Sequence, residues 1–485
     1  MMRVIRFIRT QWSLVVLYVL CVSCGDRIQL SKVIHVDEKP PLGIFQLAQT
    51  TIDVPMADFN SALYIDEMGY PRIDFTKFDT RNQGMMMQPC EVVVLENKYI
   101  RLTLIPSHGK PYSFVYKVTG HEAFFLPKVA HLHQSPNRLG WWFMLGGVEY
   151  TMPDEEHGDT WAAHWDWEIV EDSSEKKTVR MRVKELRFGL KEIVDISIYP
   201  DKAYYGAAIT ITNPTDQAVN FQHWINPMWV PGGRGEITPY TEFVIPTKEV
   251  YATERAMNDW MLDYHPQKER LQSYEDSPMR FLKGWKSHGD LLAWELEHGF
   301  YGAFCHEEDE GIVRVFPKDL NPGCNIWSWG LDPAAEARML FSGDSLNRGY
   351  VEMWGGITHS YDKYFRLSPG EEISWTEWMY PFHQTAGLHF ADQDLAVSFT
   401  RHKNDEYMLR LCPSGELRGA ECRVVIVETG EPRLRVLYDS VYPKDALPEF
   451  MLDSSDELEL IILKQGKEAI RLRAKDLSKL NYEKK

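Results

Sequence analysis

The stretch Ile209-Thr-Ile-Thr-Asn-Pro-Thr-Asp-Gln-Ala-Val-Asn-Phe-Gln-His-Trp-Ile-Asn-Pro227 decides how this chain folds. Apolar and polar residues alternate before Asn213-Pro214, and a second strand-like run follows it. Alternation with period two is typical of a strand that is buried on one face, and an Asn-Pro pair favours a turn. The stretch therefore predicts a hairpin that presents His223 among aromatic residues.

The same period recurs along most of the chain. It is clear in residues 178–184, 194–199 and 207–212, which are also rich in β-branched residues. We find no long segment that keeps a helical period with caps at both ends. Many short strands separated by turn residues predict a large antiparallel β-sandwich, and hence an all-β fold.

Three further segments accompany the hairpin. The first is Leu95–Gly109, which contains an asparagine, a proline and a glycine turn. The second is His157-Gly158, which follows a Gly-Gly pair and precedes a strand-like run. The third, Tyr350-Val-Glu-Met-Trp354, leads to a Leu-Ser-Pro-Gly-Glu turn and to the strand-like residues 373–380.

In order and spacing these segments resemble the galactose mutarotase (aldose 1-epimerase) superfamily across about residues 90 to 385. The resemblance implies a β-supersandwich whose concave sheet carries a sugar site, with a small C-terminal β-sandwich-like module after it. Where the family commonly has an arginine after the first glycine turn, this chain has Lys110. Together with the tryptophan-rich motifs at 140–147 and 325–330, this departure indicates a divergent branch.

The resemblance also implies roles for single residues. Opening and reclosing a sugar ring requires a base at the anomeric hydroxyl and an acid at the ring oxygen, and carboxylates and histidines suit these roles. By resemblance Glu352 would be the base, His223 the acid, and His157 would bind and polarise the sugar oxygens. The ligands expected for the sugar are Lys110, Asn226, Asp290, Trp224 and Trp354. His288-Gly289-Asp290 reads equally well as a turn, and Asn226 could merely end its strand.

The composition agrees with a sugar-binding protein but does not require one. The chain has 16 Trp, 23 Tyr and 22 Phe, whose flat faces suit pyranose rings or simply fill a large core. Its formal charge is −17, which makes nucleic acid an unsuitable partner. We expect a mono- or oligosaccharide as the partner, no cofactor and no metal.

The N-terminus is typical of an export signal. Arg3, Arg6 and Arg9 precede an apolar run at 14–20, which is shorter than the roughly 20 residues of a membrane span. Residues 21–25 then resemble a lipoprotein processing site, at which Cys24 becomes the lipidated first residue. An ordinary cleaved signal is the alternative. Either reading predicts an exported protein, and the first predicts a lipid anchor in the bacterial cell envelope.

A chain of 485 residues exceeds the size of a single core, so we expect several parts. We expect a signal peptide at 1–23, a tether and N-terminal extension at 24–88, the supersandwich at 89–388 and a β module at 389–485. Cys412 and Cys422 could bridge neighbouring strands or remain free thiols. The functions that compete with an epimerase are a glycoside hydrolase or polysaccharide lyase on the same scaffold, and a non-catalytic glycan-binding lipoprotein.

Overall fold

The computed structural model shows a protein built of strands. It describes residues 44–79, 84–135, 137–154, 157–252, 260–261, 272–331, 349–401, 406–415, 422–428, 431–438, 447, 449–452, 458–464 and 467–473. The helices named within these ranges are single 3-10 turns of three residues, so the predicted all-β class is confirmed. The predicted signal and Cys24 lie outside the described residues. Among the residues that are described, we find no helix long and apolar enough to cross a bilayer.

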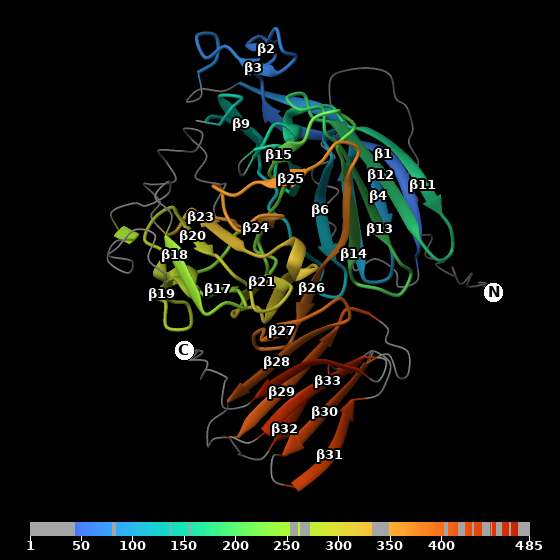
Figure 1. Ribbon diagram of the computed structural model, residues 1–485, viewed down its shortest axis with the longest axis vertical. Coiled ribbons are helices and arrows are strands. Elements are labelled where there is room, and N and C mark those ends of the chain that lie inside the picture. Colours follow the sequence, from blue (N-terminus) through green and yellow to red (C-terminus); the bar gives the residue numbers. More distant parts are fainter. Residues whose placement is uncertain are drawn as a thin grey trace, which may run out of the picture.

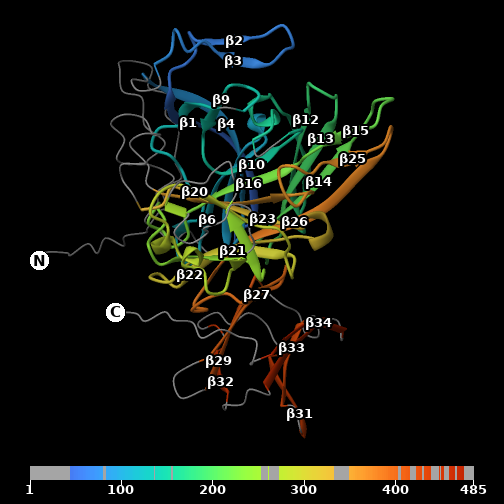
Figure 2. The same ribbon diagram turned by 60° about the vertical axis from the view of Figure 1, so that its left-hand side comes forward.

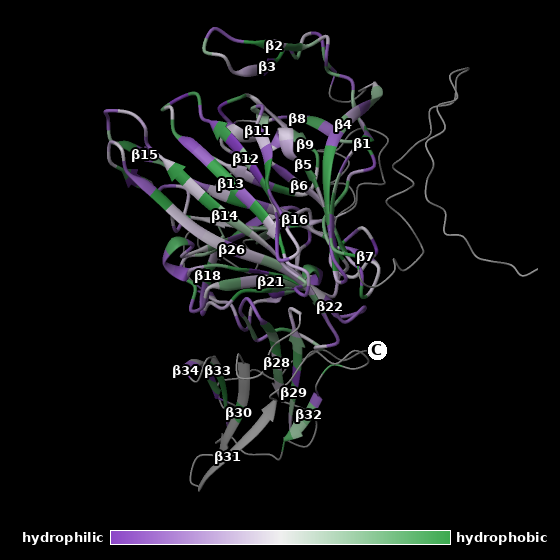
Figure 3. Ribbon diagram, turned by 90° about the vertical axis from the view of Figure 1, so that its right-hand side faces the viewer, coloured by the Kyte–Doolittle hydropathy of each residue, from purple (hydrophilic) through white to green (hydrophobic). Residues whose placement is uncertain are grey.

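An eight-stranded antiparallel sheet forms one layer of the main body (Figure 1). Several of its strands alternate between buried and more exposed residues: in residues 177–184, Val179, Met181 and Val183 are buried, and Figure 3 shows the alternation as changing colour along β12 to β14. This period places one face of these strands in the core, whereas the strands at 241–244, 300–305 and 310–315 are buried on both faces. In spatial order the strands are β11 (Asp166–Asp172), β12 (Lys177–Lys184), β13 (Lys191–Ile198), β14 (Tyr205–Thr212), β26 (Glu372–His383), β22 (Glu310–Val315), β21 (Phe300–Cys305) and β17 (Thr241–Val244).

A seven-stranded sheet forms the layer that positions the candidate site. Every residue of the five strands that carry the candidate site is buried except Trp327, which is half-buried. In spatial order the strands are β10 (Val148–Thr151), β16 (Trp224–Trp229), β24 (Val351–Gly356), β23 (Cys324–Ser328), β20 (Gly289–Ala293), β18 (Glu249–Ala252) and β19 (Gln272–Ser273).

The two layers share one hydrophobic core. Ile225 and Met353 of the seven-stranded sheet belong to the same buried cluster as Ile209 and Ile312 of the eight-stranded sheet. The Arg314 guanidinium of β22 donates to the Ile225 carbonyl oxygen at 3.2 Å and forms an ion pair with Glu377 of β26 at 2.6 Å. This face-to-face packing is that of a β-sandwich.

A five-stranded sheet, two hairpins and one further pair of strands complete the main body. The five strands are β1 (Gln46–Ala57), β4 (Met85–Glu96), β5 (Ile100–Ile105), β6 (Lys110–Tyr116) and β7 (His121–Glu122), and β1 pairs with β4 along its whole length. The hairpins are β2 (Leu63–Ile65) with β3 (Pro71–Ile73) and β8 (His131–Gln134) with β9 (Trp141–Met144), and β15 (Val219–Phe221) pairs with the distant β25 (Phe365–Leu367). The hairpin predicted across Asn213-Pro214 does not form, because β14 pairs with β13 and β26 whereas β15 pairs with β25, beside the segment that follows β24.

Two four-stranded sheets form the C-terminal part, at the end of the molecule opposite the β2–β3 hairpin (Figure 2). One contains β27 (Phe390–Ala391), β28 (Leu395–Arg401), β29 (Tyr407–Pro413) and β32 (Glu449–Leu452). The other contains β31 (Glu431–Tyr438), β30 (Cys422–Glu428), β33 (Leu458–Lys464) and β34 (Lys467–Arg473). Cys412 is a free, buried thiol, so it forms no bridge to Cys422.

Candidate functional site

One face of the seven-stranded sheet carries a stripe of polar side chains, which we call the polar stripe. Residues directly opposite each other on paired strands share a face, as do residues two apart on one strand. Asn226 lies opposite Glu149, Glu352 lies opposite Trp327, and Trp327 lies opposite Asp290. The polar stripe therefore consists of Glu149, Asn226, Glu352, Trp327 and Asp290, together with Trp224, Trp354 and Asn325, each of which lies two residues away on one of the same strands.

Lys110, Glu149 and His157 form a connected group at one end of the polar stripe. The Lys110 ammonium lies 3.1 Å from Glu149 Oε1 and donates to the Gly146 carbonyl oxygen at 2.8 Å. His157 Nδ1 lies 3.3 Å from Glu149 Oε2, and the His157 ring stacks on Trp142 with centroids 4.6 Å apart. Glu149 thus joins two of the residues that the sequence proposed.

The ionisation of this group follows from burial and pairing. Burial opposes the charge on Glu149, yet Lys110 and the hydrogen bond to His157 hold the pKa of its carboxyl at about 2. Burial lowers the pKa of Lys110, while the negative charges of Glu149 and Glu352 raise it. The cation of Lys110 is therefore already balanced by a carboxylate inside the protein.

Glu352 occupies the middle of the polar stripe, on β24. Its Oε2 accepts a hydrogen bond from Asn226 Nδ2 at 3.1 Å, and both side chains are buried. Burial and then the charge of Glu352 raise the pKa of the neighbouring Tyr350. Since Glu352 also acts electrostatically on Lys110, the carboxylate and the Lys110–Glu149–His157 group belong to one neighbourhood.

The far end of the polar stripe holds Asp290. The Tyr361 hydroxyl donates to Asp290 Oδ2 at 3.3 Å and accepts from Asn325 Nδ2 at 2.5 Å. The Trp224, Trp354 and Tyr361 rings pack together, with centroid distances of 5.0 Å for Trp224–Trp354 and for Trp354–Tyr361. The two tryptophans predicted as ligands therefore form an aromatic group next to the predicted Asp290.

Three buried polar atoms on the polar stripe have no hydrogen-bond partner among the described residues. They are Asn226 Oδ1, Asn325 Oδ1 and Trp354 Nε1. Buried polar atoms are almost always satisfied by protein, water or a ligand, because each unmet hydrogen bond costs about 1–3 kcal/mol. Their gathering on one face indicates that this face contacts water or a polar ligand.

His223 lies on the opposite face of the same sheet. It precedes Trp224 by one residue, so its side chain points toward the eight-stranded sheet, where Nε2 lies 2.7 Å from Glu192 Oε1. Both side chains are fully buried, and the His223 ring packs edge-on against Trp375 at 5.3 Å. His223 therefore does not join Glu352 and His157, and the acid role that the resemblance gave it has no place on the polar stripe.

The sequence reasoning did not single out Asn325 or Tyr361, and it named Glu149 only as a possible carboxylate partner of Glu352 in a hydrolase. Glu149 stands in the short apolar run Val148-Glu-Tyr-Thr151, where a carboxylate flanked by buried residues is the available signal. Asn325 opens the tryptophan-rich motif at 325–330. Tyr361 lies in a loop, and its contact with Asp290 spans 71 positions, so no local pattern announces it.

The glycine turn before Lys110 sets the direction of this lysine. Gly109 has φ of 62°, in the left-handed region, and a Cβ there would lie 2.4 Å from the Trp165 ring. Only glycine fits this backbone and this close approach. The turn reverses β5 into β6 and directs Lys110 toward Glu149 of β10.

Comparison with solved structures finds proteins that are similar to this chain in fold at low sequence identity. A TPR-domain containing protein from Parabacteroides distasonis is 19% identical, with a TM-score of 0.56 over 72% of this chain and 56% of the other. The chain thus spans little more than half the length of that protein. A galactose mutarotase-like protein from Clostridium acetobutylicum is 9% identical, with a TM-score of 0.43 over 61% and 96% of the two chains. A putative aldose 1-epimerase from Escherichia coli K12 is 13% identical, with a TM-score of 0.37 over 59% and 97%.

The family model that matches the chain runs from residue 66 to residue 377. Its description is a domain of unknown function, DUF5107. The match begins in the β2–β3 hairpin, includes every residue of the polar stripe and ends within β26. Because it covers more than half of the sequence, the chain belongs to the DUF5107 family.

Proposed function

We propose that this protein binds a sugar on the polar stripe and catalyses acid–base chemistry at the anomeric centre, as an aldose 1-epimerase does. The observation that carries the proposal is the polar stripe itself. It unites Glu352 with the Lys110–Glu149–His157 group and leaves three buried polar atoms without partners among the described residues. Hydroxyl groups, which both donate and accept hydrogen bonds, suit such a mixture of carbonyl oxygens and an indole N–H.

In the proposed reaction Glu352 takes the proton of the anomeric hydroxyl, and an acid protonates the ring oxygen as the bond between that oxygen and the anomeric carbon breaks. The open-chain aldehyde turns about its C1–C2 bond, and the two proton transfers run backward to close the other anomer. His157 is our candidate for the acid, because it shares the polar stripe with Glu352 whereas His223 does not. Glu149 holds the His157 ring through its Nδ1.

The charge of the polar stripe favours a neutral sugar over an acidic one. Its only lysine or arginine among the residues placed above is Lys110, which is paired with Glu149, while Glu352 and Asp290 add two more carboxyl groups. A uronate would bring its own negative charge beside these carboxyl groups without a free cation to neutralise it. This observation makes a lyase less suitable than an epimerase.

The test is a proton-NMR assay of anomer exchange with a panel of reducing sugars, performed on the wild type, Glu352→Gln and Glu372→Gln. Glu372 is exposed and lies on β26 of the other sheet, so it controls for the loss of a carboxylate elsewhere. We expect accelerated exchange that Glu352→Gln slows by about 10²–10⁴-fold and Glu372→Gln leaves unchanged. New reducing ends or unsaturated products would assign a hydrolase or a lyase instead.

A non-catalytic glycan-binding role is the second candidate, and the position of His223 favours it. If the acid of the resembling family must come from the position of His223, the chain has kept the aromatic site and lost the catalytic geometry. Sugar resonances that broaden without accelerated exchange would support this reading. Unchanged spectra with every sugar would contradict both candidates.

We also propose that the protein is exported and anchored to the cell envelope by lipid on Cys24. The support is the order of arginines, apolar residues and small residues in the first 25 positions. Mass spectrometry of the membrane fraction tests the proposal, with Cys24→Ser as the comparison. A diacylglyceryl modification that disappears in the variant is the expected result, and an unmodified N-terminus after position 24 would contradict it.

A further inference from the structure

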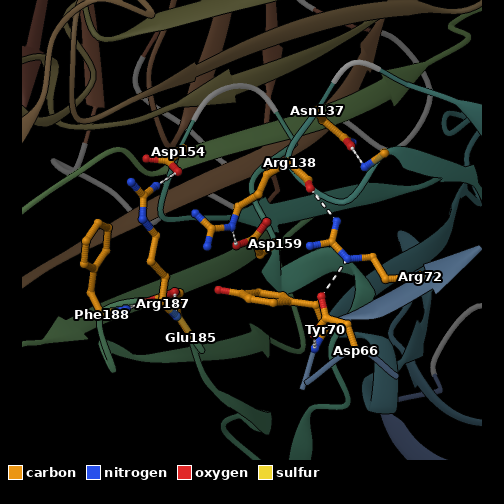
Figure 4. Close-up of polar contacts among 11 residues, drawn as sticks. Asp66, Tyr70, Arg72, Asn137, Arg138, Asp154, Asp159, Glu185, Arg187 and Phe188 are labelled. Carbon is orange, nitrogen blue, oxygen red and sulfur yellow. Dashed lines mark hydrogen bonds and ion pairs between the residues drawn. The ribbon is translucent and has the colours of Figure 1, made fainter. Parts of the chain in front are cut away.

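The β2–β3 hairpin of the N-terminal extension reaches the loop that carries His157. Tyr70 lies between the two strands of this hairpin and is 1% exposed. The guanidinium carbons of Arg72 and Arg138 lie 5.6 and 5.1 Å from the centre of its ring. Figure 4 shows the Tyr70 hydroxyl directed toward Asp159, Glu185 and Arg187. A side chain of the extension is therefore inserted next to the loop.

Two arginines from separate segments hold this loop on both sides of His157. Arg138 Nε lies 3.4 Å from Asp159 Oδ2, and Arg187 forms an ion pair with Asp154 (Figure 4). Arg72 donates to the Arg138 carbonyl oxygen at 2.5 Å, which fixes the position of Arg138 to the hairpin. Because Asp154 lies three residues before His157 and Asp159 two residues after it, these ion pairs limit where the His157 ring can lie.

Asp159 is the weakly satisfied member of this arrangement. It is 6% exposed, and neither carboxylate oxygen has a hydrogen-bond partner in the part of the chain that the structure describes. Burial raises the pKa of Asp159 to about 6; Arg138 and Arg187 lower it, while Glu185 and Asp154 raise it. Burial and the charge of Asp159 raise the pKa of Tyr70 to about 12. The anchor nearest to His157 thus titrates close to neutral pH.

We propose that Tyr70, Arg138 and Asp159 form a latch that positions His157 for the sugar chemistry, and that proton loss from Asp159 loosens it. The proposal rests on the proposed function for the role of His157 but not for the latch itself. Deprotonation leaves a buried carboxylate whose oxygens have no hydrogen-bond partner among the described residues, and the ion pair with Arg138 at 3.4 Å does not offset its burial. The charged Asp159 therefore favours a position that reaches water, so the loop keeps its Asp154–Arg187 pair and loses its second anchor. The His157–Glu149 contact, at 3.3 Å, is long for a hydrogen bond, so a small shift of the loop suffices to break it.

The first test needs no substrate. Histidines are labelled with carbon-13 in the full chain, and the His157 resonance is identified by its absence from His157→Gln. We expect Arg138→Gln to move this resonance, Arg138→Lys to restore most of its position, and Arg180→Gln to leave it unchanged. Arg180 pairs with Asp195 on β12 and β13, and its exposure is similar to that of Arg138. An unmoved resonance in Arg138→Gln would overturn the proposal.

A pH titration separates a latch from a purely structural contact. In the wild type the His157 resonance should report a second titration near pH 6, from Asp159, and Asp159→Asn should abolish that step while leaving the protein folded by circular dichroism. A second step that persists in Asp159→Asn would show that another group controls the loop. Because these measurements concern the free protein, they can succeed even if no sugar is turned over.

With a sugar in hand, the kinetic effect distinguishes positioning from binding. We expect Arg138→Gln to lower kcat about tenfold to a hundredfold while KM changes little, because a misplaced group slows chemistry more than it weakens contacts elsewhere. A change in KM alone would contradict a positioning role. If the His157 resonance shifts in Arg138→Gln but the wild type turns over no sugar, the latch proposal is supported and the proposed function is rejected.

Discussion

Removing the positive charge of Lys110 should destabilise the protein strongly at neutral pH. The pKa of Glu149 in the folded protein is about 2, whereas that of an unperturbed glutamate is about 4.3. A difference of about 2.3 units corresponds to about 3 kcal/mol, at 1.36 kcal/mol per unit. Since the folded value is the lower one, this stabilisation is fully present above about pH 4.3 and disappears as the pH falls through 2.

Lys110→Met keeps most of the side-chain volume and leaves the Glu149 carboxylate buried without its cation. Breaking a buried pair in this way costs about 3–5 kcal/mol, so we expect the free energy of unfolding at pH 7 to fall by that amount. The double variant Lys110→Met with Glu149→Gln should recover much of the loss, because it no longer buries an uncompensated charge.

Urea unfolding followed by tryptophan fluorescence, applied to the wild type, both single variants and the double variant, gives the coupling energy between the two residues. We expect a coupling of at least about 2 kcal/mol. Additive effects, with a coupling below about 0.5 kcal/mol, would refute the argument that the two charges hold each other in the folded state.

Asp159→Asn should flatten the pH dependence of stability. Relative to the variant, the wild type should lose about 3 kcal/mol of unfolding free energy between pH 4 and pH 7, because the pKa of Asp159 in the folded protein, about 6, exceeds its value in the unfolded chain. Urea midpoints of the two proteins that change in parallel with pH would contradict this. Gly109→Ala should cost about 2 kcal/mol or more, since its Cβ would overlap the Trp165 ring, and thermal melting measures the loss. His223→Asn should cost about 3–5 kcal/mol by leaving Glu192 buried and unpaired, yet change kcat less than about twofold if its role is structural.

The strand pattern made the fold accessible from the sequence. Period-two alternation is a local property, so segments such as residues 194–199 revealed their buried face without any knowledge of their neighbours. The same parity places Asn226 with Trp224, and Glu352 with Trp354, since each pair is two residues apart on one strand. The two-residue spacing within each pair, which is visible in the sequence, is the reason that its members share a face.

His223 shows where such reasoning fails. In a strand a shift of one residue exchanges the two faces of the sheet, so a motif that is matched only approximately cannot decide whether position 223 or position 224 faces the site. Contacts between distant segments were likewise outside its reach. Tyr70 meets Asp159 across nearly ninety positions, and no periodicity within either segment relates them.

The apolar cluster between the main body and the C-terminal sheets has a consequence for how this protein is assembled. Phe304 and Phe382 of the eight-stranded sheet share one buried cluster with Leu395, Leu409 and Leu460 from beyond residue 388. Neither side can be removed without uncovering the apolar surface of the other. The C-terminal sheets therefore stabilise the sandwich through this shared cluster, and we expect both parts to unfold together in a single step.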